Sequence, residues 1–254
     1  MDLKELDWLL NEKYRLVGAV NKPDLWPAEV AEDLRRLDRG EPLAYVIGFV
    51  PFLNSRIDLR FRPLIPRAET EYWVETLLNY SSLRDKKISV LDLFTGSGCI
   101  GLSVLKYWPR AEVDFVDNSP GCLEQVECNL FLNQIDSNRA NLILSDVFDQ
   151  VSEKYDLILA NPPYIDSDLF QKLPIAVRKY EPREALVAGK RGMAIMEKFF
   201  KQLSDHLKPN SQFWLEFDSS QKEAIRLILE NKFKLDFRMD QYQCWRFLVG
   251  QPWF

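Results

Sequence analysis

The most informative stretch of the chain is Leu91-Asp92-Leu93-Phe94-Thr95-Gly96-Ser97-Gly98-Cys99-Ile100-Gly101, in which an apolar run passes into a glycine-rich turn. Residues 88–94 are short and apolar, which predicts a buried strand, and 99–107 are expected to follow as a helix. Glycines at such a turn let the backbone approach a ligand closely, and the helix beyond offers free N–H groups. The stretch therefore predicts a ligand-binding loop in an α/β domain.

Three glycines of this loop, Gly96, Gly98 and Gly101, also satisfy the GxGxxG spacing of dinucleotide-binding turns. Alone this motif is a weak indication, because a glycine-rich loop without a ligand is a real alternative. Two later carboxylates strengthen it. Asp117 ends the second predicted strand, where an acid can accept hydrogen bonds from a ribose diol. Asp146 follows the third, where a carboxylate can accept one from the exocyclic amine of adenine.

Each aspartate alone is as compatible with a solvated loop or a helix cap as with a ligand. Ligands of open α/β sheets, however, bind outside the carboxyl ends of the strands. Three successive strand ends here carry suitable groups, which favours a bound nucleoside over chance.

The chain after residue 69 alternates helices with apolar strands. We predict strands over 88–94, 112–117, 141–144, 155–160 and 212–217, and helices over 99–107, 121–133, 192–207 and 220–231. The last segments, 233–238 and 244–249, indicate an antiparallel pair. Such alternation implies a largely parallel sheet covered by helices on both faces. The pattern resembles the class I S-adenosylmethionine methyltransferases, a Rossmann-like α/β fold with a mostly parallel seven-stranded sheet.

The residues before this domain predict a small helical cap followed by a β-hairpin. Leu3, Leu6 and Leu9 have helical spacing, and a second helix is expected from Trp26-Pro27 to Gly40. Residues 45–52, a turn, and an alternating run over 57–61 indicate the hairpin. We therefore divide the chain into a helical N-terminal domain (1–41), a hairpin linker (42–66) and a catalytic domain (67–254).

Composition argues against several classes of protein. The 254 residues carry a formal net charge of −5, which gives no general attraction to nucleic acid. No apolar run reaches the roughly 18 residues of a membrane helix, and the N-terminus lacks a signal-peptide core. The four cysteines form no CxxC pair and His206 is the single histidine, so we expect no metal site and no disulfide framework.

A second motif, Asn161-Pro162-Pro163-Tyr164, follows the fourth predicted strand directly. Two successive prolines stiffen the backbone and remove two N–H donors. The groups left to face the expected ligand site at the carboxyl ends of the strands are the Asn161 side chain, free carbonyls and the Tyr164 ring. The alternative is a Pro-Pro turn that begins with asparagine by chance.

That set of groups suits a planar NH₂ group as methyl acceptor. The nitrogen of an amide or aromatic amine is a poor nucleophile because its lone pair is delocalised. If the Asn161 side-chain oxygen and the Pro162 carbonyl accept its two hydrogens, the lone pair can turn towards a methyl donor. Stacking on Tyr164 would fix the acceptor plane, and catalysis would be mostly positioning and removal from water. We predict Asn161, Pro162 and Tyr164 as catalytic, and the whole tetrapeptide, Pro163 included, as the substrate site.

Three further segments narrow the choice among amino-methyltransferases. They are Glu41-Pro42-Leu43-Ala44-Tyr45-Val46-Ile47-Gly48, Leu64-Ile65-Pro66-Arg67-Ala68-Glu69-Thr70-Glu71 and Tyr180-Glu181-Pro182-Arg183-Glu184-Ala185-Leu186. Together with the loop and the tetrapeptide, they resemble the release-factor glutamine methyltransferases from about residue 40 to residue 250. The chain departs from the family in a shorter N-terminal segment, in Phe94 where a small residue is commoner, and in Asn210-Ser211 at a turn that is usually Gly-Gly.

The resemblance implies methyl transfer from S-adenosylmethionine to the glutamine amide nitrogen in the Gly-Gly-Gln motif of class I peptide chain release factors. The helical N-terminal domain would help to dock this partner. The protein would be a cytoplasmic monomer with no membrane or direct nucleic-acid partner. The expected cofactor-binding residues are Asp92, Thr95, Gly96, Gly98, Asp117, Asp146 and Asn161.

Some roles stay open. Arg67 and Glu69 are either functional or a junction ion pair, and Arg183 either lines an acceptor channel or fastens the loop 165–189, which is long enough to be a lid. A nucleic-acid adenine methyltransferase is the competing enzyme, since the same tetrapeptide can hold a flipped base. The net charge and the lack of a separate target-recognition domain count against it. A relic without activity is the other alternative, and the intact motifs count against that.

Overall fold

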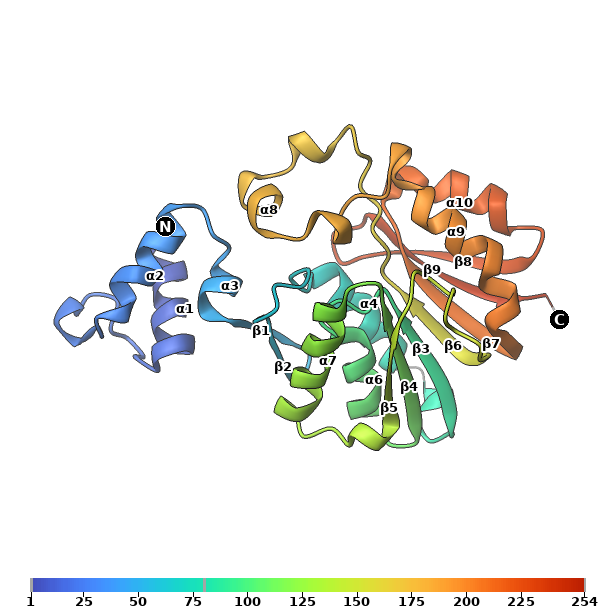
Figure 1. The fold of residues 1–254 in the computed structure, drawn as a ribbon, viewed down its shortest axis with the longest axis horizontal. Coiled ribbons are helices and arrows are strands. Elements are labelled where there is room, and N and C mark those ends of the chain that lie inside the picture. The colour runs from blue at the N-terminus through green and yellow to red at the C-terminus, as the bar shows by residue number, and fades with distance from the viewer. Residues whose placement is uncertain (1, 80, 254) are drawn as a thin grey trace.

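The computed structural model describes residues 2–79 and 81–253 and shows a sheet with helices packed on both faces (Figure 1). Its seven strands have the order β5-β4-β3-β6-β7-β9-β8. The five adjacent strands β5, β4, β3, β6 and β7 are parallel to one another. Strand β9 lies between β7 and β8 and is antiparallel to both. The predicted mostly parallel sheet is confirmed. The strands are β3 (Ile88–Leu93), β4 (Ala111–Asp117), β5 (Ala140–Leu144), β6 (Tyr155–Ala160), β7 (Leu207–Glu216), β8 (Phe233–Met239) and β9 (Trp245–Pro252).

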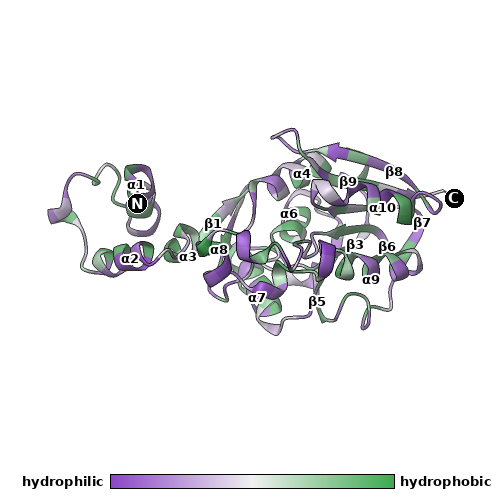
Figure 2. Ribbon diagram, turned by 90° about the horizontal axis from the view of Figure 1, so that it is seen from above, coloured by the Kyte–Doolittle hydropathy of each residue, from purple (hydrophilic) through white to green (hydrophobic). Residues whose placement is uncertain are grey.

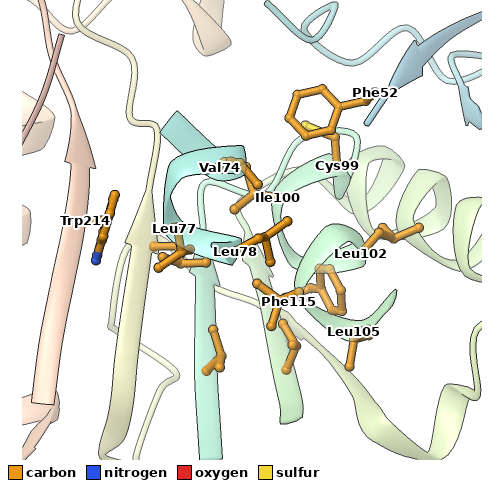
Figure 3. Close-up of a cluster of buried hydrophobic side chains, with 14 of the residues drawn as sticks. Phe52, Val74, Leu77, Leu78, Cys99, Ile100, Leu102, Leu105, Phe115 and Trp214 are labelled. Atoms are coloured by element: carbon orange, nitrogen blue, oxygen red, sulfur yellow. The ribbon is translucent and has the colours of Figure 1, made fainter. Parts of the chain in front are cut away.

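Two hydrophobic clusters fill the spaces between the sheet and its helices. Figure 3 shows part of the first cluster, where Leu77 of α4 and Leu102 of α6 pack with Phe115 of β4. The second cluster joins Phe199 of α9 to Phe213 of β7. Buried apolar surface on both faces explains why β3 and β6 consist mostly of apolar residues. The helices of this domain are α4 (Ala68–Leu78), α5 (Ser81–Arg84), α6 (Cys99–Tyr107), α7 (Pro120–Leu132), α8 (Ile175–Tyr180), α9 (Ala194–Gln202) and α10 (Lys222–Leu229).

Short 3₁₀ turns connect these elements: η1 (Pro23–Leu25), η2 (Ser137–Arg139), η3 (Phe170–Lys172), η4 (Arg183–Ala185), η5 (Lys190–Gly192), η6 (Leu203–His206) and η7 (Ser219–Gln221). Because η6 follows α9, the helix predicted over 192–207 ends early, at Gln202, and β7 begins sooner than the predicted strand at 212. Asn210, predicted to lie in a turn, lies inside β7 where the pairing with β6 shifts register, and it has φ 61°, as expected of a residue that tolerates left-handed geometry. No helix in the described part of the chain is both long and apolar enough to cross a membrane.

The N-terminal helices α1 (Leu3–Tyr14) and α2 (Glu29–Asp38) lie at one end of the molecule, apart from the sheet, with α3 (Leu43–Ile47) between (Figure 2). The two predicted helices are therefore present. Leu9 of α1 is fully buried against Val46 of α3, in a small core of its own.

The predicted hairpin is displaced. It consists of β1 (Phe49–Phe52) and β2 (Ser55–Asp58), and the first residues assigned to it form the helix α3 instead. Tyr45, Val46 and Ile47 are all buried, and a short apolar run of this kind does not distinguish a helix from a strand. Gly48, with φ 96°, ends the helix and turns the chain into β1.

Candidate active site

A cavity of about 180 Å³ lies at the carboxyl ends of the parallel strands. Thr95 and Gly96 from the loop after β3 line it, with Asp117 from the end of β4, Asp146 after β5 and Asn161 after β6. Four strand ends therefore contribute to one cavity, as the sheet topology requires. Residues predicted to bind the cofactor and residues predicted to bind the methyl acceptor therefore line the same cavity.

Asp92 lies behind this cavity and not on its surface. Its side chain is fully buried, and Oδ2 accepts hydrogen bonds from Thr95 Oγ1 (2.6 Å) and from Gly101 N (2.9 Å). Burial raises the pKa of Asp92 to about 7. Gly98, also predicted to bind the cofactor, is likewise outside the cavity lining and starts α6 with φ 81°. Both residues shape the loop from behind.

The third glycine of the loop allows α6 to pack closely on the sheet. A Cβ placed at Gly101 would lie 2.3 Å from Cε1 of Phe115 on β4, so a larger residue would push the helix away. The first turn of α6 would move with it. This is the packing role expected of the last glycine in such loops.

Asp117 has the arrangement expected of a diol-binding carboxylate. Its Oδ2 accepts from Gly96 N (2.9 Å) and its Oδ1 from Ser119 N (3.0 Å). Each carboxylate oxygen can accept more than one hydrogen bond, and Asp117 lines the cavity. Burial raises the pKa of Asp117. Asp146 is exposed and is paired with Lys198 at 2.9 Å.

The cavity also has apolar sides. Phe94 and Val147 line it and have φ of 63° and 57°. Positive φ in such residues is strained and typical of functional sites. The Phe94 ring packs edge-on against the Phe199 ring, with the ring centroids 6.5 Å apart. Carboxylates between apolar flanks suit a nucleoside diol and amine better than a pyrophosphate, so the residues present fit an adenosyl group.

The acceptor tetrapeptide divides between the cavity and the interior. Asn161 and Pro163 line the cavity, whereas Pro162 and Tyr164 do not. The Tyr164 hydroxyl donates to Glu216 Oε1 (3.2 Å), and burial raises the pKa of Tyr164. The stacking role predicted for the Tyr164 ring therefore has no support in this geometry.

A buried polar network behind Asn161 was missed in the sequence. Asn161 Nδ2 donates to Thr70 Oγ1 (3.2 Å), and Thr70 Oγ1 donates to Glu216 Oε2 (2.7 Å). Trp73 Nε1 donates to the same oxygen (2.8 Å). These partners come from α4 and the end of β7, far from the tetrapeptide in sequence. The one available signal was that Glu216 ends an apolar strand.

The open roles at the domain junction are clarified. Arg67 lines the cavity and pairs with the buried Glu181, at 2.7 and 2.8 Å, and Ile65 N donates to the same carboxylate. No ion pair joins Arg67 to Glu69 within the described residues. Arg183 is exposed and lies over the Phe170 ring at 5.1 Å, within the segment 165–189. Both arginines thus have partners within the fold, and Arg67 in addition faces the cavity.

Two cysteines, Cys99 and Cys122, line the cavity, although nothing in the sequence suggested it. Burial raises the pKa of each thiol to about 12. Both thiols are therefore protonated and add weakly polar surface. Among the described residues, no group of His, Cys, Asp and Glu side chains is arranged to hold a metal ion.

Residues 70–175 match the family described as Methyltransferase small domain. The release factor glutamine methyltransferase of Lactococcus lactis subsp. lactis is 35% identical over 234 residues, which cover 91% of this chain and 82% of that protein. A ribosomal protein L11 methylase from Lactobacillus delbrueckii subsp. bulgaricus superposes with a TM-score of 0.54 at 23% identity, over 75% and 81% of the two chains.

A 16S rRNA methyltransferase from T. thermophilus, solved in complex with AdoMet and guanosine, superposes with a TM-score of 0.56 at 16% identity. The match covers 80% of this chain and 49% of that chain. Both superpositions bear on the fold alone, and they confirm the predicted class I methyltransferase fold.

Proposed function

This chain belongs to the release factor glutamine methyltransferase family, and from that premise we propose that it methylates the side-chain amide nitrogen of a glutamine. The glutamine is that of the Gly-Gly-Gln motif in class I peptide chain release factors. The observation that carries the proposal is that Asn161 lines the same cavity as Asp117 and Thr95. An acceptor amide held by Asn161 would thus meet a donor held by the loop.

S-adenosylmethionine, the methyl donor of this family, supplies an electrophilic methyl group when bound. Asp117 would accept from the ribose hydroxyls with the lone pairs that Gly96 and Ser119 leave free. Asp146, on the exposed side, would accept from the adenine amine. Thr95 and Gly96 would contact the donor from the loop. Asp92 and Gly98 would act indirectly, by shaping that loop.

On the acceptor side, Asn161 and the Pro162 carbonyl would accept the two amide hydrogens of the substrate glutamine. The lone pair of its nitrogen would then point at the donor. No strong general base is required, because the nitrogen loses its proton only after its charge has developed. Catalysis is positioning in a cavity from which water is excluded.

The domain division proposed for the chain, 1–41, 42–66 and 67–254, gives the N-terminal helices a docking role. The end of α2 is tied to the loop beside the cavity, because Tyr180 Oη donates to Arg39 O (3.0 Å). Glu41 forms ion pairs with Arg36 of α2 (2.8 Å) and with Arg62 (2.6 Å), which follows the hairpin. These pairs connect α2 to the linker. A release factor bound to these helices would lie next to the cavity. We further propose that the protein acts as a cytoplasmic monomer.

The proposal is tested with purified release factor and a variant in which the Gly-Gly-Gln glutamine is alanine. Labelled methyl should pass from S-adenosylmethionine to the first protein and not to the second. Peptide mass spectrometry should place the added mass on that glutamine. Label on neither protein, or equal label on both, would contradict the proposal, and transfer to adenine in DNA or RNA would support the competing enzyme.

A further inference from the structure

We propose that Glu216 is a positioning residue which, acting through Thr70, fixes the atom of the Asn161 amide that faces the methyl acceptor. The inference rests on the proposed function and deepens it, because it concerns how Asn161 receives the NH₂ group of the substrate. Glu216 itself is outside the cavity lining.

The carboxylate of Glu216 ends β7 in a buried position, 1% exposed. Three side chains donate to it: Thr70 and Trp73 to Oε2, at 2.7 and 2.8 Å, and Tyr164 to Oε1, at 3.2 Å. Burial raises the pKa of Glu216, whereas the three donors and the nearby Arg246 lower it. The indole N–H of Trp73 can only donate, so Oε2 is an accepting oxygen, and it sets the direction of the bond from Thr70.

The direction is passed on by the Thr70 hydroxyl. A hydroxyl has one proton, and the proton of Thr70 is used in the bond to Glu216. Towards Asn161 the Thr70 oxygen can therefore only accept. The atom of Asn161 that lies 3.2 Å from it must be the donor, Nδ2.

This constraint decides what Asn161 presents to the cavity. With Nδ2 held by Thr70, the Oδ1 atom is the one left for a ligand. A glutamine amide brings two N–H donors, so it needs an oxygen at this point. The flipped amide would set its own NH₂ against the NH₂ of the substrate and lose the interaction.

The same carboxylate also holds the other end of the tetrapeptide. Tyr164 donates its hydroxyl to Glu216, and Gln221 Nε2 donates to the Tyr164 carbonyl (3.0 Å). Both ends of the acceptor motif are therefore fixed by buried side chains, of which Thr70 also lines the cavity. This arrangement gives Tyr164 an anchoring function in place of stacking.

The test uses the full-length chain and three threonine variants of α4. Thr70→Val removes the hydroxyl with little change of shape, and Thr70→Ser restores it. Thr76→Val is the matched control, because the Thr76 hydroxyl donates only to Tyr72 O on the same helix. We expect Thr70→Val to lower kcat about tenfold to a hundredfold, the scale of a misplaced reacting group, with the KM for S-adenosylmethionine unchanged. Thr70→Ser and Thr76→Val should stay within about threefold of the wild type.

Glu216→Gln keeps the shape of the side chain and turns one accepting atom into a donor. It should lower kcat at least as much as Thr70→Val, and the double variant should lose no more than the worse single one, because both act through one chain of hydrogen bonds. A wild-type kcat in Thr70→Val would overturn the inference. So would a loss confined to cofactor affinity or to Tm, or one that Thr70→Ser does not restore.

A readout without turnover separates this inference from the proposed function. In ¹⁵N NMR spectra, the hydrogen-bonded Nδ2 proton of Asn161 should exchange slowly with deuterium in the wild type and rapidly in Thr70→Val. Slow exchange in the wild type with no methyl transfer to any release factor would leave the inference standing and the proposed function refuted. Rapid exchange in both proteins would refute the inference whatever the activity.

Discussion

The donor side and the acceptor side of the cavity are held in different ways. On the donor side, Asp117 is fixed by backbone N–H groups of Gly96 and Ser119, and Asp92 fixes the loop through Thr95 and Gly101. On the acceptor side, Asn161 and Tyr164 are fixed by side chains of distant elements that meet at a buried carboxylate. The donor side is thus a largely local structure. The acceptor side depends on long-range packing.

The largest effect that separates the two sides is expected from Asn161→Ala. It removes the oxygen that accepts from the substrate amide, and we expect methyl transfer to fall by about 10²-fold or more, the scale of losing one fixed hydrogen bond to the reacting group. Calorimetry should give a Kd for S-adenosylmethionine within about twofold of the wild type. Equal loss of binding and transfer would mean that Asn161 belongs to the donor side.

The next largest effect tests how firmly the acceptor motif is supported from behind. A Cβ at Gly192, which has φ +65°, would lie 1.9 Å from the Tyr164 carbonyl oxygen. Gly192→Ala should therefore lower the free energy of unfolding by about 2–4 kcal/mol. Gly121→Ala is the control, since its nearest neighbour is Ser119 Oγ at 3.8 Å. Thermal unfolding of both variants measures the difference, and equal Tm values would show that the contact is not constraining.

On the donor side, Asp117→Ala should act in the opposite way to Asn161→Ala. The loss of a hydrogen-bonded carboxylate that contacts the cofactor should weaken S-adenosylmethionine binding by about tenfold or more. Transfer at saturating cofactor should be largely retained. Titration calorimetry checks the first point, and an unchanged Kd would show that Asp117 does not hold the ribose.

The smallest effect concerns Asp92, whose folded-state pKa of about 7 lies above the ordinary value of 3.8 for an aspartate. The folded protein holds this proton more tightly, so the contribution of Asp92 to stability is fully present below pH 3.8 and is lost as pH rises through 7. The wild type should lose up to about 1 kcal/mol per pH unit relative to Asp92→Asn in this window. Urea unfolding between pH 5 and 8 measures it, and parallel curves would contradict the account.

The contrast between the sides also explains what the sequence could predict. Asp117, Asp146 and Asn161 follow strands, and parallel strands bring their carboxyl ends together, so their meeting at one cavity follows from topology. The strands themselves were predictable because apolar runs flanked by turns mark buried strands, although β7 begins at Leu207, before the predicted position 212.

Two features could not be predicted, for physical reasons that differ. The direction of the Tyr164 side chain depends on Glu216 and Thr70, which no local pattern connects to it. In the helix α3 (Leu43–Ile47) the successive residues Tyr45, Val46 and Ile47 are all buried, so its apolar run has no periodicity to separate it from a strand.

The most direct test of the division into two sides is single-turnover methyl transfer to release factor, with wild type, Asn161→Ala and Asp117→Ala measured in parallel over increasing S-adenosylmethionine. The account predicts that saturating cofactor brings Asp117→Ala to within about threefold of the wild-type rate and leaves Asn161→Ala about 10²-fold below it. Recovery of both variants at high cofactor, or of neither, would contradict it.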